Sequence, residues 1–484
     1  MGDVPAAIRH KARSVMVLVY KTLAVALVAL GAPALLNSVN EPVVSLVETV
    51  LVSRVGTLFL AALAPASAMF GLVEEVCFAF SVAVTTALSA LSVEREALGG
   101  GARAKLELAP PTEETTHLVT ASVCAAFVGG LALALALQAL YGPICKIMLV
   151  PNEVEALLRM YTVFRCVGLP MFAAANALEG AFLGRKDALT TMWVWLASGV
   201  ITAGLQVLYI TPGMGATSAV LFAGIALTTG QAYSFAMFSI IARRRGFLVL
   251  RSVFEVAETF SQSAKRAFKK LVDAEIISEV AWLVLNATAR MTTYMILTTF
   301  ATQFGVVPAA VNKTLLDIYI LLGLCAEPVF TVGNVLLPRK RDNPEDVAIT
   351  RRALFSIALF MGLTLGVAAY IACGSAVLFD DPRSLEMAKN LRVVVAVTIG
   401  FSTAAYATDG CVIGTGDAKF VGTAQLVNIA IFIAGFIFLQ RSYGAAMSLQ
   451  HVWSALLAFQ ALRLVEHAWK IREDEHALGL AIRG

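Results

Sequence analysis

The stretch LVTASVCAAFVGGLALALAL, residues 118–137, decides the fold class of this chain, because it carries no charged side chain over twenty residues. A helix of about 20 apolar residues spans the roughly 30 Å hydrocarbon core of a bilayer. Similar runs recur from Val15 to Val465, and their polarity does not alternate as it does along a membrane β-strand. The whole chain of 484 residues is 58% apolar and only 14% charged, so the sequence predicts an all-α membrane protein.

Turn residues divide the apolar runs into twelve segments. The breaks include Gly142-Pro143, Pro212-Gly213 and Asp381-Pro382, and glycine and proline at such positions interrupt helices. We therefore expect twelve transmembrane helices, over residues 17–53, 57–92, 115–143, 153–183, 187–211, 214–242, 276–303, 306–337, 347–378, 385–414, 418–440 and 444–468.

Lysine and arginine are distributed unevenly over the connections between these segments. Every second connection is basic, and the clusters 243–270 and 339–352 belong to this set. The other connections hold only Arg54, Lys146, Arg383, Lys389 and Arg441. By the positive-inside rule, the basic connections and both termini face the cytoplasm or an equivalent compartment. The segment 243–275 is also partly amphipathic, which predicts a linker that lies along the membrane surface on the cytoplasmic side.

A motif near the end of the fourth predicted segment recurs near the end of the tenth, at an offset of 230 residues. The first copy consists of Glu179, Gly180, Gly184, Asp187 and Ala188, and the second of Asp409, Gly410, Gly414, Asp417 and Ala418. Gln231-Ala232 and Gln460-Ala461 repeat in nearly the same register. We interpret these residues as structural elements of an internal duplication.

The duplication predicts two six-helix bundles, related by a pseudo-twofold axis along the membrane normal, because six spans return the chain to the same side. The predicted domains are an N-terminal lobe over residues 1–242, the linker over 243–275, and a C-terminal lobe with a short cytoplasmic tail over 276–484. Two like bundles that face each other leave a cleft that can open to either side. This geometry is typical of transport by alternating access.

Several of these patterns resemble the multidrug and toxic compound extrusion (MATE) family. Residues 46–56, LVETVLVSRVG, and the LAALA at 60–64 resemble the end of helix one and the start of helix two of that family. Gly168-Leu169-Pro170 with the first repeat copy resembles its fourth helix, the second copy its tenth, and Glu327-Pro328 fits its eighth. The likeness covers about residues 20–465 and is greatest to the plant-type organellar branch, which includes salicylate-pathway and other organic-anion exporters.

The resemblance implies a secondary-active exporter of small organic molecules or xenobiotics, not an enzyme. Re-entry of H⁺ or Na⁺ would drive it, with no other cofactor. The alternative is a lipid-linked oligosaccharide flippase of the same superfamily, while a channel is disfavoured because no selectivity-filter run is present. The expected partners are the lipid bilayer and a small organic substrate, without nucleic acid, and we expect a monomer. The expected membrane is the plasma membrane or the envelope of a plastid or another organelle.

Ionisable residues within the first span are the candidates for cation coupling, because a charge at mid-bilayer costs at least about 2.5–3.5 kcal/mol. Asn37, Glu41 and Glu48 share one face of the predicted helix. The resemblance places the family's helix-one carboxylate, which is central to coupling, at Glu48. A desolvated carboxylate can take up a proton on one side and release it on the other. The structural alternative is a carboxylate at the helix end that pairs with Arg54.

The fifth span departs from the family pattern. Where many members carry an asparagine and an aspartate four residues apart, this chain has Thr202 and Gln206. The missing acid favours H⁺ over Na⁺. No pair of cysteines has the spacing of metal ligands, and we expect no bound metal.

Charged residues also mark a candidate cavity for substrate, mostly in the second half. They are Glu75, Glu279, Arg290, Lys313, Asp317 and Glu327. Lys313 and Asp317 are four residues apart and can neutralise each other, and Arg290 can pair with Asp317 or Asp409. A basic lining that binds anionic substrates is the alternative to such structural pairs.

Two further pairs of acids lie within the predicted spans. Glu74 and Glu75 are adjacent in the second span, so at least one faces the cavity and the other needs a partner such as Arg165. For Glu179 and Asp409, we favour caps that close a helix end over coupling sites.

Overall fold

The structure is a computed structural model, and it describes residues 20–98, 113–185, 187–249, 276–337 and 343–477. The described residues are helical or lie in turns, without any strand. In chain order, the elements are the π-helix η1 (Leu27–Gly31), α2 (Ala32–Ser53), α3 (Thr57–Leu98), α4 (Glu113–Ala139), α5 (Tyr141–Ile147), α6 (Asn152–Gly184), α7 (Ala188–Tyr209), α8 (Ala216–Arg244), α10 (Ile276–Thr302), α11 (Val306–Leu324), α12 (Glu327–Leu336), α13 (Pro344–Ala372), α14 (Pro382–Gly414), α15 (Ala418–Tyr443), the short 3₁₀ turn η3 (Gly444–Ala446) and α16 (Leu449–Ala477).

The predicted all-α membrane fold is confirmed. Ten segments of the described chain are helices long and apolar enough to cross a membrane. Two further long helices, α10 and α16, coincide with predicted spans but carry more polar residues, such as Asn286 and Arg290 in α10 and Arg463 and His467 in α16. The predicted segment 306–337 is divided into α11 and α12.

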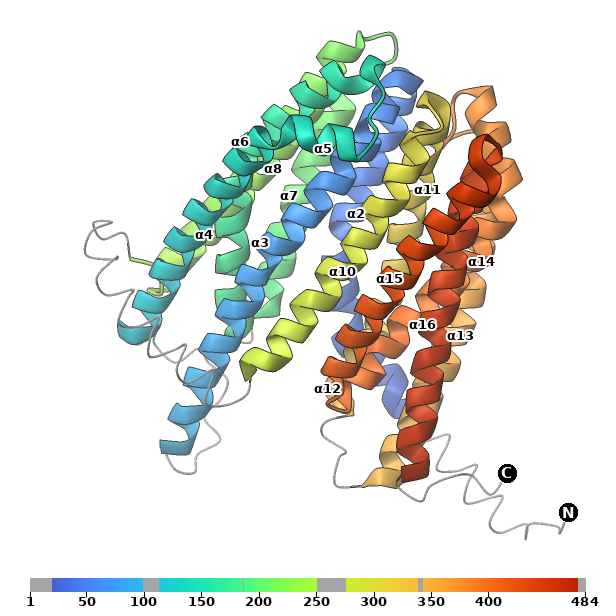
Figure 1. Cartoon of the computed structure of the whole chain (residues 1–484). Helices are drawn as coiled ribbons and strands as arrows, with labels where there is room; N and C mark the ends of the chain where they lie inside the picture. The colour runs from blue at the N-terminus through green and yellow to red at the C-terminus, as the bar shows by residue number, and fades with distance from the viewer. Residues whose placement is uncertain (1–19, 99–112, 186, 250–275, 338–342, 478–484) are drawn as a thin grey trace, which may run out of the picture. The chain divides into compact units, whose positions relative to one another are not determined.

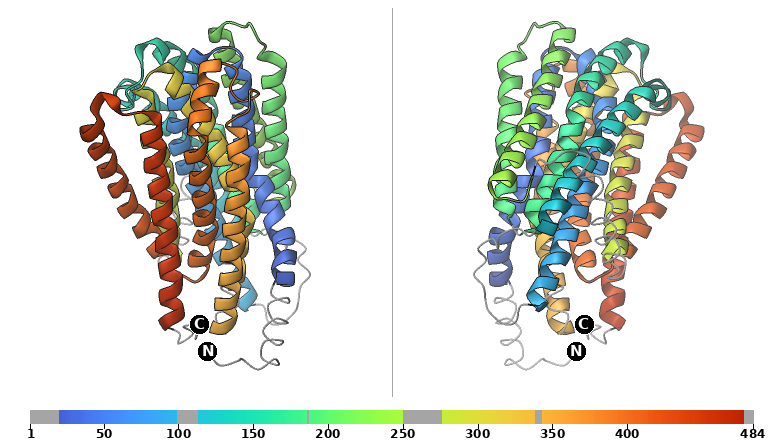
Figure 2. Two further views of the ribbon diagram at one scale, coloured as in Figure 1. Left: turned by 90° about the vertical axis from the view of Figure 1, so that its right-hand side faces the viewer. Right: turned by 90° about the vertical axis from the view of Figure 1, so that its left-hand side faces the viewer.

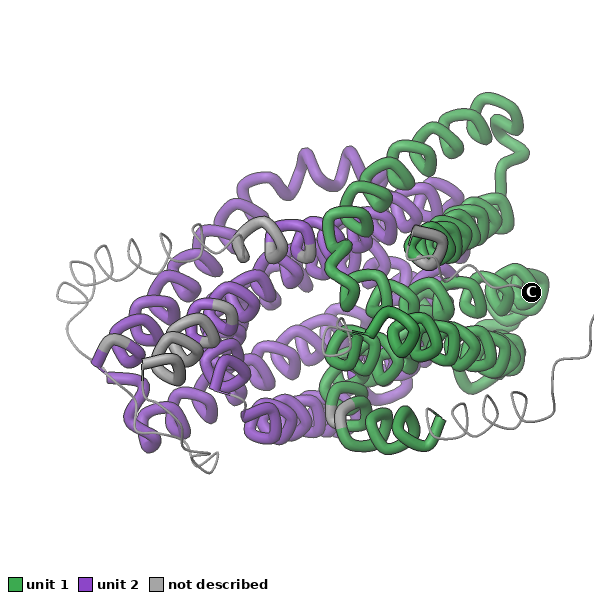
Figure 3. Tube along the Cα trace, turned by 90° about the horizontal axis from the view of Figure 1, so that it is seen from below, with its two compact units in different colours: residues 1–43, 314–484 green, residues 44–313 purple. Residues whose placement is uncertain are grey.

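The chain forms two compact units, which Figure 3 shows in different colours. Unit 1 comprises residues 1–43 and 314–484, and unit 2 comprises residues 44–313. These units divide the chain within α2 and within α11, whereas the predicted lobes divide it at the linker 243–275, of which residues 250–275 lie outside the described residues. The predicted lobe boundaries stay a prediction.

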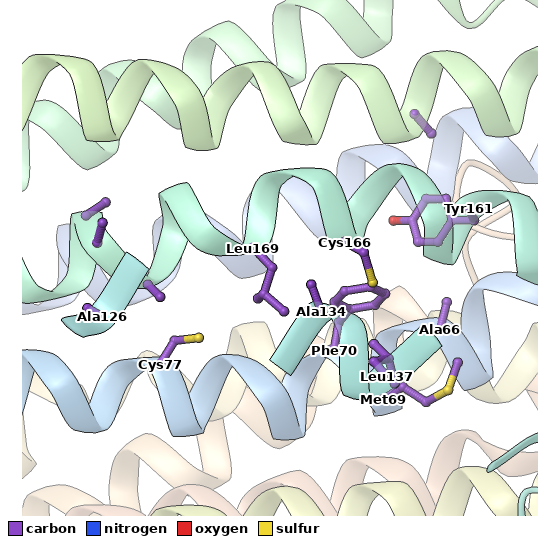
Figure 4. Packing of buried hydrophobic residues seen from close by; sticks show 14 of the residues in the cluster. Ala66, Met69, Phe70, Cys77, Ala126, Ala134, Leu137, Tyr161, Cys166 and Leu169 are labelled. Carbon is purple, nitrogen blue, oxygen red and sulfur yellow. The ribbon is translucent and has the colours of Figure 1, made fainter. Parts of the chain in front are cut away.

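The core of unit 2 lies between α3, α4 and α6. Figure 4 shows this packing, with Met69 and Phe70 from α3, Leu137 from α4, and Cys166 and Leu169 from α6. All five side chains are at most 8% exposed. The helices α8 and α10 pack on this core, against α6 and α3 respectively.

Glycines of the first repeat copy bring α6 onto α3. A Cβ atom on Gly180 would lie 2.3 Å from the backbone oxygen of Ser81, and one on Gly184 would lie 2.9 Å from the Cβ of Leu88. The hydroxyl of Thr85 donates a hydrogen bond of 3.1 Å to the carbonyl of Gly180. Small residues four apart allow this close approach of two membrane helices.

Unit 1 repeats this arrangement around α14, which packs against α12, α13 and α16 (Figures 1 and 2). A Cβ atom on Gly410 would lie 2.2 Å from the carbonyl oxygen of Phe330, and one on Gly414 would lie 2.5 Å from that of Gly333. The two copies of the sequence motif therefore serve the same packing role in the two units.

Asp187, the last acid of the first copy, is the N-cap of α7. Its carboxylate accepts hydrogen bonds from the backbone N–H of Thr190 at 3.2 Å and from the Thr190 hydroxyl at 2.7 Å, and it pairs with Arg245. Partial burial by itself raises the pKa of Asp187, but these hydrogen bonds outweigh it and hold the pKa below its ordinary value. In the second copy, Asp417 occupies the N-cap position of α15 and lies 3.8 Å from Lys470 Nζ.

Candidate functional site

Glu48 lies in the part of α2 that belongs to unit 2, and only 5% of this residue is exposed. The hydroxyl of Tyr161, from α6, donates a hydrogen bond of 2.9 Å to Glu48 Oε1. A phenol hydroxyl can donate to a carboxylate and can also accept from a carboxylic acid. The contact therefore suits Glu48 both with and without a proton. Arg54, which is the alternative partner that the sequence suggests, is exposed.

Arg165 lies one turn after Tyr161 on α6 and forms an ion pair with Glu74 of α3. Its guanidinium carbon is 4.2 Å from the ring centroid of Phe70 and 5.9 Å from that of Tyr161. Aromatic faces stabilise a cation that has left water. The prediction that one of the adjacent glutamates has Arg165 as its partner is confirmed for Glu74.

The second of these glutamates contacts a different helix. The Glu75 carboxylate lies 3.8 Å from Arg290 of α10. Successive residues of a helix project about 100° apart, which lets α3 place one acid against α6 and the next against α10. Both side chains stay partly exposed, at 14% for Glu75 and 21% for Arg290. The partner of Arg290 in this contact is thus neither of the two acids that the sequence suggests.

Lys313 of α11 supplies a further buried charge in unit 2. It is 2% exposed, and its ammonium donates a hydrogen bond of 3.1 Å to the hydroxyl of Ser45. Ser45 lies three residues before Glu48, so one stretch of α2 receives polar contacts from both α6 and α11. These contacts define the candidate site, which consists of Glu48, Tyr161, Arg165, Glu74, Glu75, Arg290 and Lys313.

The remaining candidates of the first span lie in unit 1, where Asn37 is half-buried and Glu41 is exposed. Glu279 lies within α10, but its side chain is outside the described residues. Thr202 and Gln206 are buried in α7. Within the part of the chain that the structure describes, neither amide atom of Gln206 has a hydrogen-bond partner.

Two other predicted cavity residues belong to unit 1. Glu327 begins α12 and accepts hydrogen bonds from the hydroxyl of Tyr406 in α14 and from that of Thr331, the latter at 3.0 Å. The Tyr406 ring stacks on Phe330, with 5.0 Å between the centroids. Asp317 of α11 is 5% exposed.

The first acid of each motif copy, Glu179 or Asp409, is not a helix cap, contrary to the sequence-based preference. Glu179 and Asp409 lie inside α6 and α14, and they are 4% and 0% exposed. Glu179 accepts a hydrogen bond of 3.4 Å from the Ser81 hydroxyl on α3. Asp409 pairs with Arg463 at 2.7 Å and with His467 at 3.1 Å, both from α16. Glu179 contacts α3, which the motif glycines bring close to α6, whereas Asp409 contacts α16 and the glycines of its copy contact α12.

Tyr161, Arg463 and His467 were not predicted from the sequence as members of polar clusters. A signal for Arg463 was present, since an arginine within a predicted span needs a buried partner. Tyr161 and His467 gave no such signal, because an aromatic residue in a span is usually part of the core.

The comparisons with known proteins relate the chain to transporters, although no family model matches it. Protein DETOXIFICATION 44, chloroplastic, of Arabidopsis thaliana is 25% identical over 459 residues, which cover 92% of this chain and 81% of that protein. Protein DETOXIFICATION 45, chloroplastic, from the same plant is 22% identical, with 91% and 76% covered. The inward-facing structure of a multidrug resistance MATE family transporter of the MOP superfamily has a TM-score of 0.73 at 13% identity, with 92% of this chain and 96% of that chain covered.

The chain is therefore an integral multi-pass membrane protein with the fold of a MATE transporter. It is a homologue of the plant DETOXIFICATION proteins, and the resemblance to the MATE family is confirmed. These proteins are transporters and not enzymes, as the sequence analysis expects.

Proposed function

We propose that this protein is a cation-coupled antiporter that exports small organic molecules, with H⁺ as the coupling ion. Glu48 is the proposed site of proton uptake. The observation that carries the proposal is the buried contact between Glu48 and Tyr161, which is compatible with both protonation states of the carboxyl group. Alternate exposure of Glu48 to the two sides of the membrane would then couple proton entry to substrate exit.

The ion pairs around Glu48 support this role. Arg165 is ion-paired with Glu74 and lies over the ring of Phe70. The positive charge next to Tyr161 is therefore already balanced by Glu74. The neutral Thr202 and Gln206 in α7 replace a further acid, which is consistent with H⁺ and less so with Na⁺, since a hard cation prefers charged oxygen ligands.

For the architecture, we propose twelve transmembrane helices in two six-helix lobes, over residues 1–242 and 276–484, related by a pseudo-twofold axis along the membrane normal. The equivalent glycine contacts of α6 on α3 and of α14 on α12 support the duplication. The segment 243–275 would join the lobes on the cytoplasmic side. The cleft between the lobes is the proposed path of the substrate.

The proposed substrates are small organic anions, because Arg290 and Lys313 are basic side chains of the candidate site. The proposed membrane is the plasma membrane or a plastid envelope, the latter suggested by the two chloroplastic relatives. We expect a monomer to suffice for transport. The comparisons give no support to an oligosaccharide flippase, and we do not propose it.

Flux measurements in proteoliposomes test this function. An imposed pH gradient should drive the uptake of members of a panel of organic anions, with a panel of cationic dyes measured in parallel. Glu48→Gln should abolish the gradient-driven component, because the amide cannot carry a proton across the cycle.

Glu153→Gln is the matched control, since Glu153 is exposed at the start of α6 and should tolerate the same change. Full gradient-driven flux in the Glu48→Gln protein would refute the assignment of Glu48. If no member of either panel responds to the gradient in the unaltered protein, the antiport proposal itself is wrong.

A further inference from the structure

A second cluster of ionisable side chains lies in unit 1, where α14 meets α16. Asp409 is fully buried, and Arg463 and His467 are 3% and 2% exposed. Neither arginine nor histidine is needed to fill an apolar helix interface, and a buried charge is costly unless it is paired. The proposed function assigns no role to this cluster.

Asp409 contacts both other side chains, by a hydrogen bond from Arg463 and by a close contact with the ring of His467. Arg463 Nη2 donates to Asp409 Oδ2 at 2.7 Å, and His467 Nε2 lies 3.1 Å from Asp409 Oδ1. Through its other guanidinium nitrogen, Arg463 donates to the side-chain oxygen of Gln460 at 3.0 Å. The Gln460 amide donates to the Tyr319 hydroxyl at 2.6 Å, so the network extends to α11.

The contact with Asp409 fixes one of the two ring protons of His467. A ring nitrogen without a proton would repel a carboxylate oxygen 3.1 Å away, so His467 Nε2 carries a proton in every state. An additional proton can therefore enter only at His467 Nδ1.

Thr408 gives this Nδ1 atom a partner in both states. The Thr408 hydroxyl oxygen is 3.0 Å from His467 Nδ1 and 2.9 Å from the carbonyl oxygen of Ala405. With neutral histidine, the hydroxyl donates to Nδ1. With protonated histidine, Nδ1–H donates to the hydroxyl oxygen, and the hydroxyl turns to donate to Ala405. Rotation of the Thr408 hydroxyl thus gives His467 Nδ1 a hydrogen-bond partner in either protonation state.

The other charged groups on the surrounding helices are bonded elsewhere. Arg351 of α13 donates to Asp474 at 2.9 Å, and Glu466 of α16 accepts from Asn428 of α15 at 2.7 Å. Glu327 of α12 accepts from Tyr406. The charge on the Asp409 cluster therefore changes chiefly with the protonation of His467.

We propose that His467, which lies between Asp409 and Thr408, is a proton-binding site of unit 1. One proton binds to Nδ1, and the net charge of the cluster rises by one. The inference extends the proposed function, because it adds a second proton site besides Glu48 on a different pair of helices. The ligand is H⁺ itself, and no metal or other group is needed.

Histidine NMR on the full chain in lipid nanodiscs tests the site without a transport assay. The chain has five histidines, and the resonance that is missing from His467→Gln identifies His467. We expect its ring nitrogen shifts to change from the neutral to the charged form as the pH falls from about 8 to about 5. A His467 resonance that stays in one form over this range would overturn the proposal.

Thr408→Val tests the geometry, since valine keeps the shape of threonine without its hydroxyl. Removal of the Thr408 hydroxyl destabilises the charged form of His467 more than the neutral form, because hydrogen bonds to charged groups are stronger. The midpoint of the His467 titration should therefore fall by about one pH unit. Thr398→Val is the matched control, because Thr398 is equally buried on α14 and its hydroxyl bonds only to the Val394 carbonyl in the described structure. An unchanged midpoint in Thr408→Val contradicts the proposed hydrogen-bond switch.

This experiment separates the two proposals. If a pH gradient drives no flux but His467 titrates as described, the proton site stands and the antiport fails. If the gradient drives flux and His467 does not titrate, only the second site is wrong.

Discussion

Arg165 connects more parts of the candidate site than its neighbours do, because it touches Glu74, Phe70 and Tyr161 at once. Its side chain and that of Glu74 are only 9% and 12% exposed. At a mostly buried position, an ion pair such as Arg165–Glu74 contributes little net stability compared with an apolar pair of similar volume. Removal of one partner, however, leaves the other charge buried without compensation.

We predict that Arg165→Met lowers the free energy of unfolding by about 3–5 kcal/mol, because the Glu74 carboxylate then lacks its cation. The double variant Arg165→Met/Glu74→Gln should recover most of this loss, since the neutral amide needs no counter-charge. Denaturant titrations of the three proteins in mixed micelles measure both effects. Equal destabilisation in the single and double variants would show that packing on Phe70, and not charge, accounts for the loss.

The candidate site was only partly predictable from the sequence. The pair Glu74–Arg165 could be inferred, because each ionisable residue in a membrane span requires a partner. The hydrogen bond from Tyr161 to Glu48 and the contact of His467 with Asp409 could not be inferred. They depend on which faces of neighbouring helices meet, and the sequence does not specify this.

At the level of the helices, most of the fold could be predicted, because apolar length and turn residues are local properties. Helix α7 begins at Ala188, one residue after the predicted start at 187, and α14 ends at Gly414 as expected. The break between α11 and α12 was missed. Pro328 is compatible both with a kink and with a new helix start, and the sequence alone does not distinguish them.

The helix contacts made by the repeat glycines give a second prediction. Gly410→Ala and Gly180→Ala should each strongly destabilise the protein, because the new methyl group would lie 2.2 Å from the Phe330 oxygen and 2.3 Å from the Ser81 oxygen. The backbone on both sides must move, and overpacking of this kind costs about 1–3 kcal/mol or more. Thermal unfolding followed by fluorescence-detected size-exclusion chromatography measures the change.

Gly435→Ala provides the control for the same substitution. Gly435 lies within α15, and a Cβ atom there would meet no other atom within 4 Å. Since alanine favours a helix by about 0.5–1 kcal/mol over glycine, this variant should be at least as stable as the unaltered protein. A loss of stability at all three positions alike would indicate that the glycines are needed for helix flexibility and not for close packing.

At the scale of the whole molecule, the duplication is the feature that links sequence to mechanism. The two motif copies bring α6 onto α3 in unit 2 and α14 onto α12 in unit 1. The first acid of each copy has different partners, because Glu179 accepts a hydrogen bond from Ser81 whereas Asp409 pairs with Arg463 and His467. Equivalent glycine packing supports the proposed duplication, and the different partners indicate that the polar contacts of the two copies have diverged.

Transmembrane topology tests this duplication directly, because two lobes of six spans have like orientation. Single cysteines at Arg54, Arg244, Arg383 and Arg472 suit the test, since all four residues are exposed near helix ends. They are introduced after the seven native cysteines have been replaced.

With a membrane-impermeant maleimide on intact cells, we expect labelling at positions 54 and 383. Positions 244 and 472 should react only after permeabilisation, because the basic connections face the cytoplasm. If the protein resides in an organelle, the same pairs are expected in isolated organelles. Labelling of 54 and 383 from opposite sides would mean an odd number of spans between them instead of the predicted eight, and two six-span lobes of like orientation would then be excluded.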